Sequence, residues 1–238
     1  MKQALAFLTP LGGAATPSPR ALPWFPIVGA LVGGAVGITW WAAAQWWSLP
    51  VAAVLAIVAD LVLTGMLHVD GLADSADGLL PPLSRERRLE VMKDPRTGAF
   101  GVVAVVTVLL LRVAVLASIA PTTTTALTIA GIWCASRGAM AVTACTVPYA
   151  RGTGLATAFL GGNAIVIAAI AVPLALTAGA AGTDPHVRGV LAVVGCGLGA
   201  ALVVAFARAK LGGFTGDVLG AAGVVGETLA LLILAVHA

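Results

Sequence analysis

The chain has 238 residues, of which 60% are hydrophobic and 10% are charged, and its mean hydropathy is +1.04. These values exclude an ordinary water-soluble globular domain and place the chain in a lipid bilayer. The formal net charge is only +3, and no nucleic acid is expected as a partner.

Long apolar runs predict an all-α fold, a polytopic bundle of membrane-spanning helices. A helix needs about 17–25 apolar residues to cross about 30 Å of hydrocarbon. The runs are continuous, whereas strands of a transmembrane barrel alternate polar with apolar residues. We expect a single membrane domain over residues 1–238, with about seven spans at 27–47, 50–67, 99–119, 124–147, 161–181, 188–207 and 218–237.

The positive charges predict the orientation of these spans. Ten of the 13 Lys and Arg residues fall in the leader or in the loops that share its side of the membrane: Lys2, Arg20, Arg85, Arg87, Arg88, Lys93, Arg96, Arg151, Arg208 and Lys210. Because Lys and Arg accumulate in cytoplasmic loops, the N-terminus is expected to be cytoplasmic.

An acidic motif, HVDGLADSADG, follows the second span and begins a cytoplasmic loop predicted over residues 68–98. On a helix, the spacing of Asp70, Asp74 and Asp77 brings the three carboxylates to one face, with neighbours about 5–6 Å apart. Such carboxylates repel one another unless a cation holds them ionised, and all-oxygen ligation favours Mg²⁺, with Mn²⁺ as the alternative. The competing interpretation is a solvated loop in which Asp70 caps a helix.

The rest of this loop carries basic residues and the candidate catalytic groups. His68 is interpreted as a general base or as a partner of the metal site, with a structural role as the alternative. In MKDPRTGAFG, we expect Lys93 and Arg96 to bind substrate and Asp94 to act in catalysis. The alternative is that these residues form a solvated surface with no catalytic role. The segment SRERRLEVM is typical of an interfacial amphipathic helix capped by Ser84, whose arginines serve topology and anionic lipid.

Four charged residues lie within predicted spans and require partners, because unpaired ions are unfavourable in lipid. Asp60 and Arg112 are expected to form a structural pair, and a proton or ion path is the rival interpretation. Glu227 has no evident partner in the sequence. Arg137 is placed near the cytoplasmic end of its span, where it is expected to bind a substrate phosphate.

The polar, glycine-containing segments all fall on the predicted cytoplasmic side. They include VPYARGTGLATAF, with Arg151, and the loop predicted over 208–217, KLGGFTGD, with Lys210 and Asp217. Phosphoryl transfer needs metal ions and cations to neutralise phosphate oxygens and to align the reactants. We therefore expect Asp217 to complete the metal site and the basic side chains to bind phosphate.

The motifs HVDGLADSADG, MKDPRTGAFG, SRGAM, PYARGTGLATAF and KLGGFTGDVLGAA, in that order, resemble those of the cobalamin synthase family, the adenosylcobinamide-GDP ribazoletransferases. The resemblance covers nearly the whole chain, including ALAFLTPL in the leader and WFPIVGALVGG at the first span. It implies a multi-pass, Mg²⁺-dependent enzyme of the bacterial cytoplasmic (inner) membrane, with its active site facing the cytoplasm.

The resemblance implies a reaction that joins adenosylcobinamide-GDP to α-ribazole, or to its 5′-phosphate, and releases GMP. Asp70, Asp74 and Asp77 match the acidic motif of the family, and Asp217 matches its closing GGxTGD motif. We place Thr215, in that motif, among the substrate-binding residues. Membrane lipid is a further expected partner, and the sequence is compatible with an oligomer.

The sequence departs from the usual family pattern at two points. Thr64, Gly65 and Met66 stand where TGG is common, and Pro95 stands where a serine is frequent, so a backbone N–H that could bind phosphate is missing there. Neither point changes a carboxylate.

Two other functions were weighed. A CDP-alcohol phosphotransferase would carry DGxxAR, but Asp70-Gly71 is followed by Leu72-Ala73-Asp74. A transporter would place its functional residues near the middle of the membrane, whereas the polar motifs here gather on one side.

Overall fold

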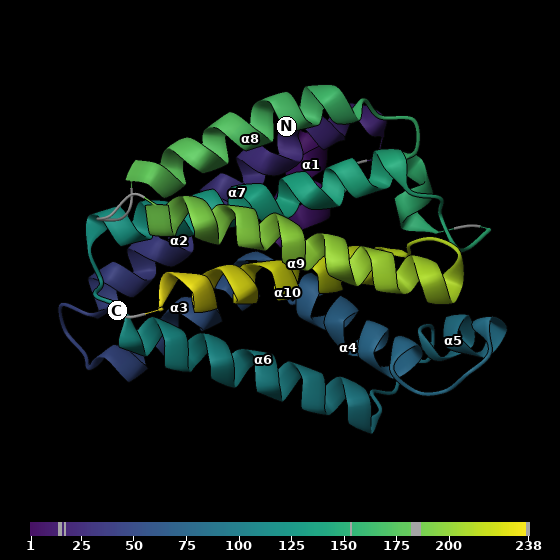
Figure 1. Cartoon of the computed structure of the whole chain (residues 1–238), viewed down its shortest axis with the longest axis horizontal. Helices are drawn as coiled ribbons and strands as arrows, with labels where there is room; N and C mark the ends of the chain where they lie inside the picture. Colours follow the sequence, from purple (N-terminus) through teal and green to yellow (C-terminus); the bar gives the residue numbers. More distant parts are fainter. Residues whose placement is uncertain (14–15, 17, 153, 182–186, 237–238) are drawn as a thin grey trace.

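The computed structural model describes the whole chain except residues 14–15, 17, 153, 182–186 and 237–238 (Figure 1). The described residues contain ten α-helices and no strand, so the expected all-α fold is confirmed. The helices are α1 (Lys2–Leu8), α2 (Phe25–Ala43), α3 (Leu49–Leu63), α4 (Leu67–Leu79), α5 (Arg85–Val91), α6 (Ala99–Ser118), α7 (Thr123–Thr146), α8 (Ala164–Ala181), α9 (Val187–Leu211) and α10 (Gly216–Leu234). Three 3₁₀ segments accompany them, at Pro10–Gly12, Pro19–Trp24 and Leu155–Phe159.

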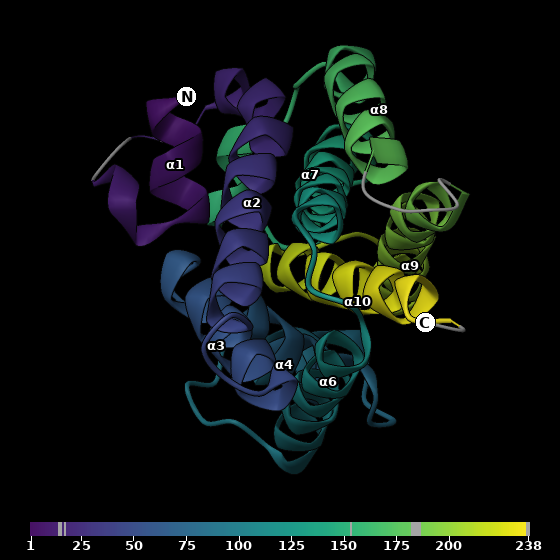
Figure 2. The same cartoon turned by 90° about the vertical axis from the view of Figure 1, so that its left-hand side faces the viewer.

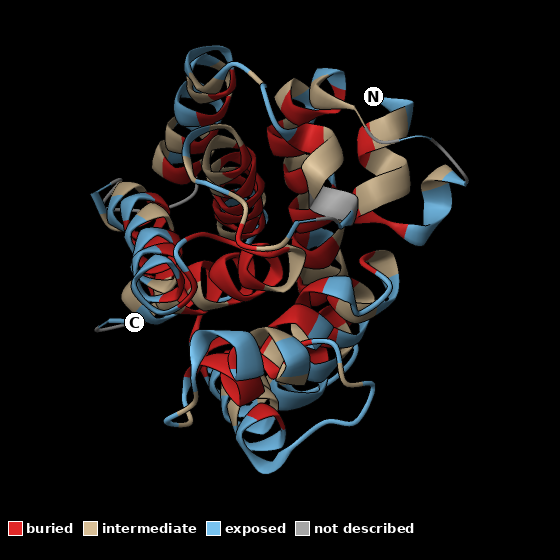
Figure 3. Ribbon diagram, turned by 90° about the vertical axis from the view of Figure 1, so that its right-hand side faces the viewer, coloured by how far each residue is buried: buried red, intermediate tan, exposed pale blue. Residues whose placement is uncertain are grey.

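The long helices form a bundle around α7 and α10. Seen end-on in Figure 2, α10 lies between α7 on one side and α4 and α6 on the other, and it packs against all three and against α9. Helix α7 in turn packs against α2, α8 and α9. The buried residues in Figure 3 face this interior, and large apolar side chains such as Val103, Leu110 and Leu198 are exposed on the outside. An apolar exterior of this kind suits contact with lipid tails.

Six helices are long and apolar enough to cross a membrane, or up to seven if α3 and α4 together form one bent span. A multi-pass membrane protein is thereby supported, and the predicted spans 99–119, 124–147, 161–181, 188–207 and 218–237 each correspond to one helix. The first span begins slightly earlier than predicted, at Phe25.

The second predicted span, 50–67, is interrupted. Helix α3 ends at Leu63, and α4 begins at Leu67 with its axis turned by 89°. The turn uses left-handed backbone at Gly65 (φ 57°) and Met66 (φ 59°), a conformation that glycine adopts readily and that other residues adopt less readily. The acidic motif, at the start of the predicted 68–98 loop, is therefore a helix packed in the bundle.

Glycines on α2 allow it to pack closely against α7. A Cβ added at Gly33 would lie 2.8 Å from the carbonyl oxygen of Ile129, and one added at Gly37 would lie 2.7 Å from that of Ala126. Both distances are too short for a real side chain, so these glycines serve helix packing, as small residues do in membrane bundles.

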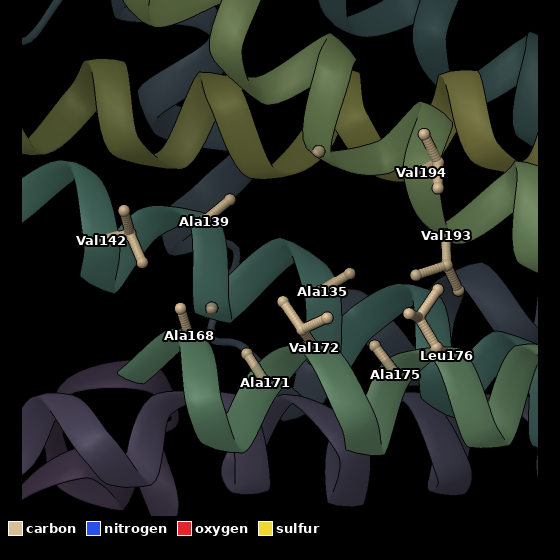
Figure 4. Close-up of a pocket in the computed structure, with 12 residues that line it drawn as sticks. Ala135, Ala139, Val142, Ala168, Ala171, Val172, Ala175, Leu176, Val193 and Val194 are labelled. Carbon is tan, nitrogen blue, oxygen red and sulfur yellow. The ribbon is translucent and has the colours of Figure 1, made fainter. Parts of the chain in front are cut away.

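A groove of about 310 Å³ lies between α7, α8 and α9. Figure 4 shows its wall of small side chains from α7 and α8, with Val193 and Val194 of α9 on the other side. All twelve lining residues are alanine, glycine, valine or leucine. None of these side chains is polar, so none of them could bind a metal ion or a phosphate.

Candidate active site

The site is built where α4 crosses the N-terminal half of α10. Two glycines bring the backbones together: a Cβ on Gly71 would lie 2.7 Å from the carbonyl oxygen of Asp217, and one on Gly220 would lie 3.2 Å from the Cα of His68. Any larger side chain at these positions would separate the helices. The acidic motif and the GGFTGD motif, far apart in the sequence, are therefore held in contact.

The start of α10 is fixed by its own cap and by a neighbouring loop. The hydroxyl of Thr215 accepts a hydrogen bond from the Val218 N–H (3.3 Å) and donates one to Asp217 Oδ2 (3.2 Å). Phe214 is bound on both sides, since its N–H donates to the Pro148 carbonyl (2.9 Å) and its carbonyl accepts from the Ala150 N–H (2.8 Å). Thr215 is thus the buried N-cap of α10. This capping role explains why a residue with a hydroxyl group occupies the position.

The same backbone bridge delivers Arg151 to the site. Arg151 Nη2 lies 2.9 Å from Asp217 Oδ2 and 3.1 Å from the carbonyl oxygen of Met92. Nε of Arg151 is buried and has no hydrogen-bond partner among the residues that the structure describes. The arginine therefore retains donor capacity close to Asp217, which an anionic ligand could use.

These groups border a cavity of about 260 Å³ between α1, α4, α7, α10 and the loop after α7. Its polar side chains are those of His68, Asp70, Tyr149, Arg151 and Asp217. The remaining lining residues are Phe7, Leu67, Met140, Gly154, Gly216, Leu219 and Gly220.

Asp70, Asp74 and Asp217 form an acidic surface on the facing sides of α4 and α10. Asp217, Asp70 and Asp77 all repel the carboxylate of Asp74, and Arg151 attracts it. Asp70 lies in the first turn of α4, whose N-cap is Met66, so the alternative of Asp70 as a helix cap is wrong.

Asp77 has a separate structural task. Its Oδ2 accepts a hydrogen bond from the Gly98 N–H (2.7 Å), and its Oδ1 accepts one from the Gly101 N–H (2.9 Å). Both carboxylate oxygens therefore bind the N-terminus of α6, where backbone N–H groups lack helical partners. Glycine is required at both positions, because a Cβ at either would lie 2.6 Å from an oxygen of Asp77.

In their present positions, the carboxylates beside the cavity form only part of a Mg²⁺ site. Among the described residues, no three His, Cys, Asp or Glu side chains lie close enough together to hold a metal ion. Mg²⁺, however, keeps several waters and is commonly bound by one or two carboxylates together with substrate phosphates. Asp70 and Asp217, which line one cavity, suit that mode, and Asp74 lies beside them.

His68 lines the cavity and is buried, with 3% of its surface exposed. Within the described part of the chain, neither ring nitrogen has a hydrogen-bond partner. Buried polar atoms normally have partners, and His68 is an exception. Its position in the cavity lining is compatible with the predicted catalytic role, which stays a prediction.

The predicted residues Lys93, Asp94 and Arg96 lie on the surface loop between α5 and α6. Two nitrogens of Arg96 donate to Asp94 at 2.7 and 3.0 Å, and these hydrogen bonds lower the pKa of Asp94 to about 2. Lys210 is also exposed, with Nζ 5.6 Å from the ring centre of Phe206. None of these residues lines the cavity.

Arg137 lies elsewhere than expected. Its side chain is 2% exposed, pairs with Glu227 and donates to the Ser136 hydroxyl at 2.8 Å. This placement corrects the expectation that Arg137 binds a substrate phosphate, because its guanidinium is committed inside the bundle.

The other intramembrane charges complete the same buried network. Arg112 lies 3.2 Å from Asp60 and 2.8 Å from Glu227, and the Trp133 indole N–H donates to Asp60 at 2.9 Å. The expected pair of Asp60 with Arg112 is confirmed. The view that Glu227 lacks a partner is wrong, since it receives both arginines.

Helix α5 has the predicted cap, because the Ser84 hydroxyl accepts from the Arg87 N–H at 3.3 Å. The interpretation of its arginines needs correction. Arg88 is buried and donates to the carbonyls of Gly78 (2.8 Å) and Leu79 (2.7 Å). Arg85 donates to the carbonyls of Leu211 (2.8 Å) and Ala150 (3.0 Å). These two side chains tie protein segments together, and Arg87 alone fits the surface role.

The family model described as cobalamin-5-phosphate synthase matches residues 1–235. The chain belongs to this family. The match spans α1 to α10, so every element that builds the cavity lies within it.

Relatives of the chain agree in their names. Proteins called adenosylcobinamide-GDP ribazoletransferase are similar to the chain: that of Citrobacter koseri is 37% identical over 217 residues, and those of Escherichia coli and Shigella boydii are each 36% identical over 227 residues. Each alignment covers 90% of this chain and 87% of the relative. No solved structure was found to match the chain.

Proposed function

We propose that this protein is an adenosylcobinamide-GDP ribazoletransferase, which joins adenosylcobinamide-GDP to α-ribazole or its 5′-phosphate and releases GMP. The family match over residues 1–235 and relatives of that name at 36–37% identity support the assignment. The observation that carries it within the structure is the meeting of Asp70, Asp217 and Arg151 at one cavity.

In the proposed reaction, the ribose 3′-hydroxyl of the acceptor attacks the phosphorus that bears the aminopropanol arm of cobinamide. The new P–O bond forms as the bond to the departing GMP breaks, and the hydroxyl proton leaves to a base. Arg151, now paired with Asp217, is placed to bind phosphate oxygens. Such transfers depend mainly on alignment and on neutralising phosphate charge.

Magnesium is part of the proposal. Asp70 and Asp217 would hold Mg²⁺, with Asp74 as a further ligand, and the ion would neutralise charge on the phosphates. The two cavity-lining carboxylates and the repulsion among the neighbouring acids support this role. Asp77 is left to cap α6, since both of its oxygens are occupied.

The proposed location is the bacterial inner membrane, with the site facing the cytoplasm. The support is the distribution of Lys and Arg over the loops on the side of the N-terminus.

The direct test is turnover by the purified protein in detergent. Incubation with adenosylcobinamide-GDP and α-ribazole phosphate should yield a new corrinoid and an equal amount of GMP, separated by chromatography, in the presence of Mg²⁺ and not after chelation. Asp217→Asn should reduce the rate at least 100-fold, and Glu90→Gln, at an exposed surface carboxylate, should not. Failure of the wild-type protein to form the corrinoid would refute the assignment.

A further inference from the structure

His68 is the most unusual polar group in the cavity. It is 3% exposed, and both of its ring nitrogens are buried without a partner in the described structure. Leaving a buried donor or acceptor unsatisfied destabilises the folded protein. A side chain kept in this state at a cavity wall points to a ligand that supplies the missing partner.

Apart from its charged side chains, His68 and the hydroxyl of Tyr149, the cavity has an apolar lining. Phe7 and Tyr149 contribute aromatic rings, and Met140 and Leu219 contribute flexible or branched apolar chains. The rings are held in place, since Phe7 contacts Phe159 edge-on with ring centres 4.6 Å apart. Such a wall suits a flat, uncharged ring system with few polar edges.

The polar residues Asp70, Arg151 and Asp217 belong to the same cavity and are less buried than His68. A ligand lying between the two regions would have an apolar part beside His68 and a hydroxyl or phosphate beside the carboxylates and the arginine. A nucleoside with an apolar base has this division.

The volume limits which substrate part can enter. The cavity holds about 260 Å³, which lies below the roughly 300–1,000 Å³ typical of sites for drug-sized ligands. A corrin ring is far too large. A single two-ring heterocycle is compact enough.

We infer that this cavity binds the base of the acceptor nucleoside, a dimethylbenzimidazole, with the His68 side chain donating a hydrogen bond to the unsubstituted ring nitrogen of that base. The inference rests on the proposed function and adds to it the location of one substrate. Uncharged imidazole has one N–H donor, and the base offers one acceptor nitrogen and otherwise apolar edges. The ribose then extends toward Asp70, Arg151 and Asp217.

The guanine of the other substrate fits this cavity less well. Guanine has several donors and acceptors on its edges, and each needs a partner when buried. Phe7, Met140 and Leu219 offer none, and of the polar side chains in the lining Arg151 and Asp217 are already hydrogen-bonded to each other.

The test separates the two substrates kinetically. His68→Leu should raise the KM for α-ribazole phosphate about tenfold or more, the loss expected for one buried hydrogen bond, with the KM for adenosylcobinamide-GDP within twofold of wild type. His68→Gln, whose amide can donate, should recover most of the affinity. Binding of α-ribazole to the protein alone, measured by calorimetry, should weaken in the same order.

Ser75→Ala is the matched control. Ser75 lies on the same helix, is buried and has an unpartnered hydroxyl, but it lines a different pocket. It should leave both KM values unchanged. If His68→Leu acts no more strongly than Ser75→Ala, the inference is wrong.

Two other results would overturn the inference while leaving the proposed function standing. A rise in the KM for adenosylcobinamide-GDP alone would place guanine in the cavity. A fall in kcat in both His68 variants, with the KM for acceptor unchanged, would show proton transfer in place of base binding. Absence of turnover by the wild-type protein, in contrast, would reject the proposed function itself.

Discussion

Arg112 and Glu227, 115 positions apart in the chain, lie 2.8 Å from each other inside the bundle. Glu227 also pairs with Arg137, and Arg112 also pairs with Asp60. The network contains two positive and two negative side chains, so their charges balance. Balanced pairing is what allows ions to lie at this depth in a membrane protein.

Removing one member of the network should destabilise the fold. Glu227→Gln leaves Arg112 and Arg137 without their shared carboxylate, and breaking a buried ion pair typically lowers stability by about 3–5 kcal/mol. We expect a large drop in the thermal unfolding midpoint in detergent. Glu90→Gln breaks the exposed Arg87–Glu90 pair (64% of each side chain exposed) and should change stability by less than about 1 kcal/mol. Equal shifts would contradict the assigned role.

Replacing Asp70 and replacing Asp77, both on α4, should affect the Mg²⁺ requirement of the enzyme differently. Asp70→Asn should raise the Mg²⁺ concentration needed for half-maximal activity, because it removes a proposed ligand. Asp77→Ala should instead lower stability by about 0.5–2 kcal/mol, the usual effect of losing a helix cap, and extra Mg²⁺ should not restore it. Activity titrated against Mg²⁺, together with thermal unfolding, separates the two. A shifted Mg²⁺ requirement in Asp77→Ala alone would reverse the assignment.

The contact between α4 and α10 should be sensitive to one methyl group. Gly71→Ala adds a Cβ 2.7 Å from the Asp217 carbonyl and must separate the two helices. A displacement of about 1 Å at a catalytic site can reduce the rate about 100-fold, so a large loss of turnover is expected. Gly197→Ala, where nothing lies within 4 Å of the added atom, is the control and should keep wild-type turnover. Normal activity in Gly71→Ala would show that this contact is not needed.

The arginines of α5 should differ from one another. Arg88→Gln removes donors from the carbonyls of Gly78 and Leu79, and leaving these buried acceptors unpaired should lower stability by about 1–3 kcal/mol. Arg87→Gln, on the exposed side of the helix, should have little effect. Denaturation in detergent would measure both, and a larger effect at Arg87 would show that lipid contact dominates.

The orientation can be tested on the loop between α5 and α6. Lys93 is exposed, and a Lys93→Cys variant, in a background with the partly exposed Cys145 replaced, should resist a membrane-impermeant thiol reagent in intact cells. The same variant should react in inverted membrane vesicles. Labelling from the outside of cells would place the site in the periplasm.

Hydropathy was enough to predict the helical bundle. Continuous apolar runs have one structural solution in lipid, so the helices from α6 to α10 lie where they were predicted. The spacing of Asp70, Asp74 and Asp77 predicted neighbouring carboxylates on a helix, and α4 carries all three. The pair of Asp60 and Arg112 followed from the need to compensate ions in hydrocarbon.

Other features depend on contacts that the sequence does not show. The break between α3 and α4 arises at Gly65 and Met66, where hydropathy continues without interruption. An arginine is usually expected on the surface. Arg88, however, lies on α5 where it meets the C-terminal end of α4 and donates hydrogen bonds to carbonyls there. Arg137 was misplaced because hydropathy does not give the depth of a residue along its span, nor which face of its helix meets Glu227.

The four charges of the buried network come from four different helices, α3, α6, α7 and α10, and Glu227 is carried by the last to be synthesised. Until α10 has entered the bilayer, Arg137 lacks its acidic partner and Arg112 has only Asp60. Insertion of α10 therefore supplies the carboxylate that pairs with the buried arginines of α6 and α7. It also brings Asp217 to α4. The same helix therefore carries both Glu227, which pairs with the buried arginines, and Asp217, which lies at the cavity.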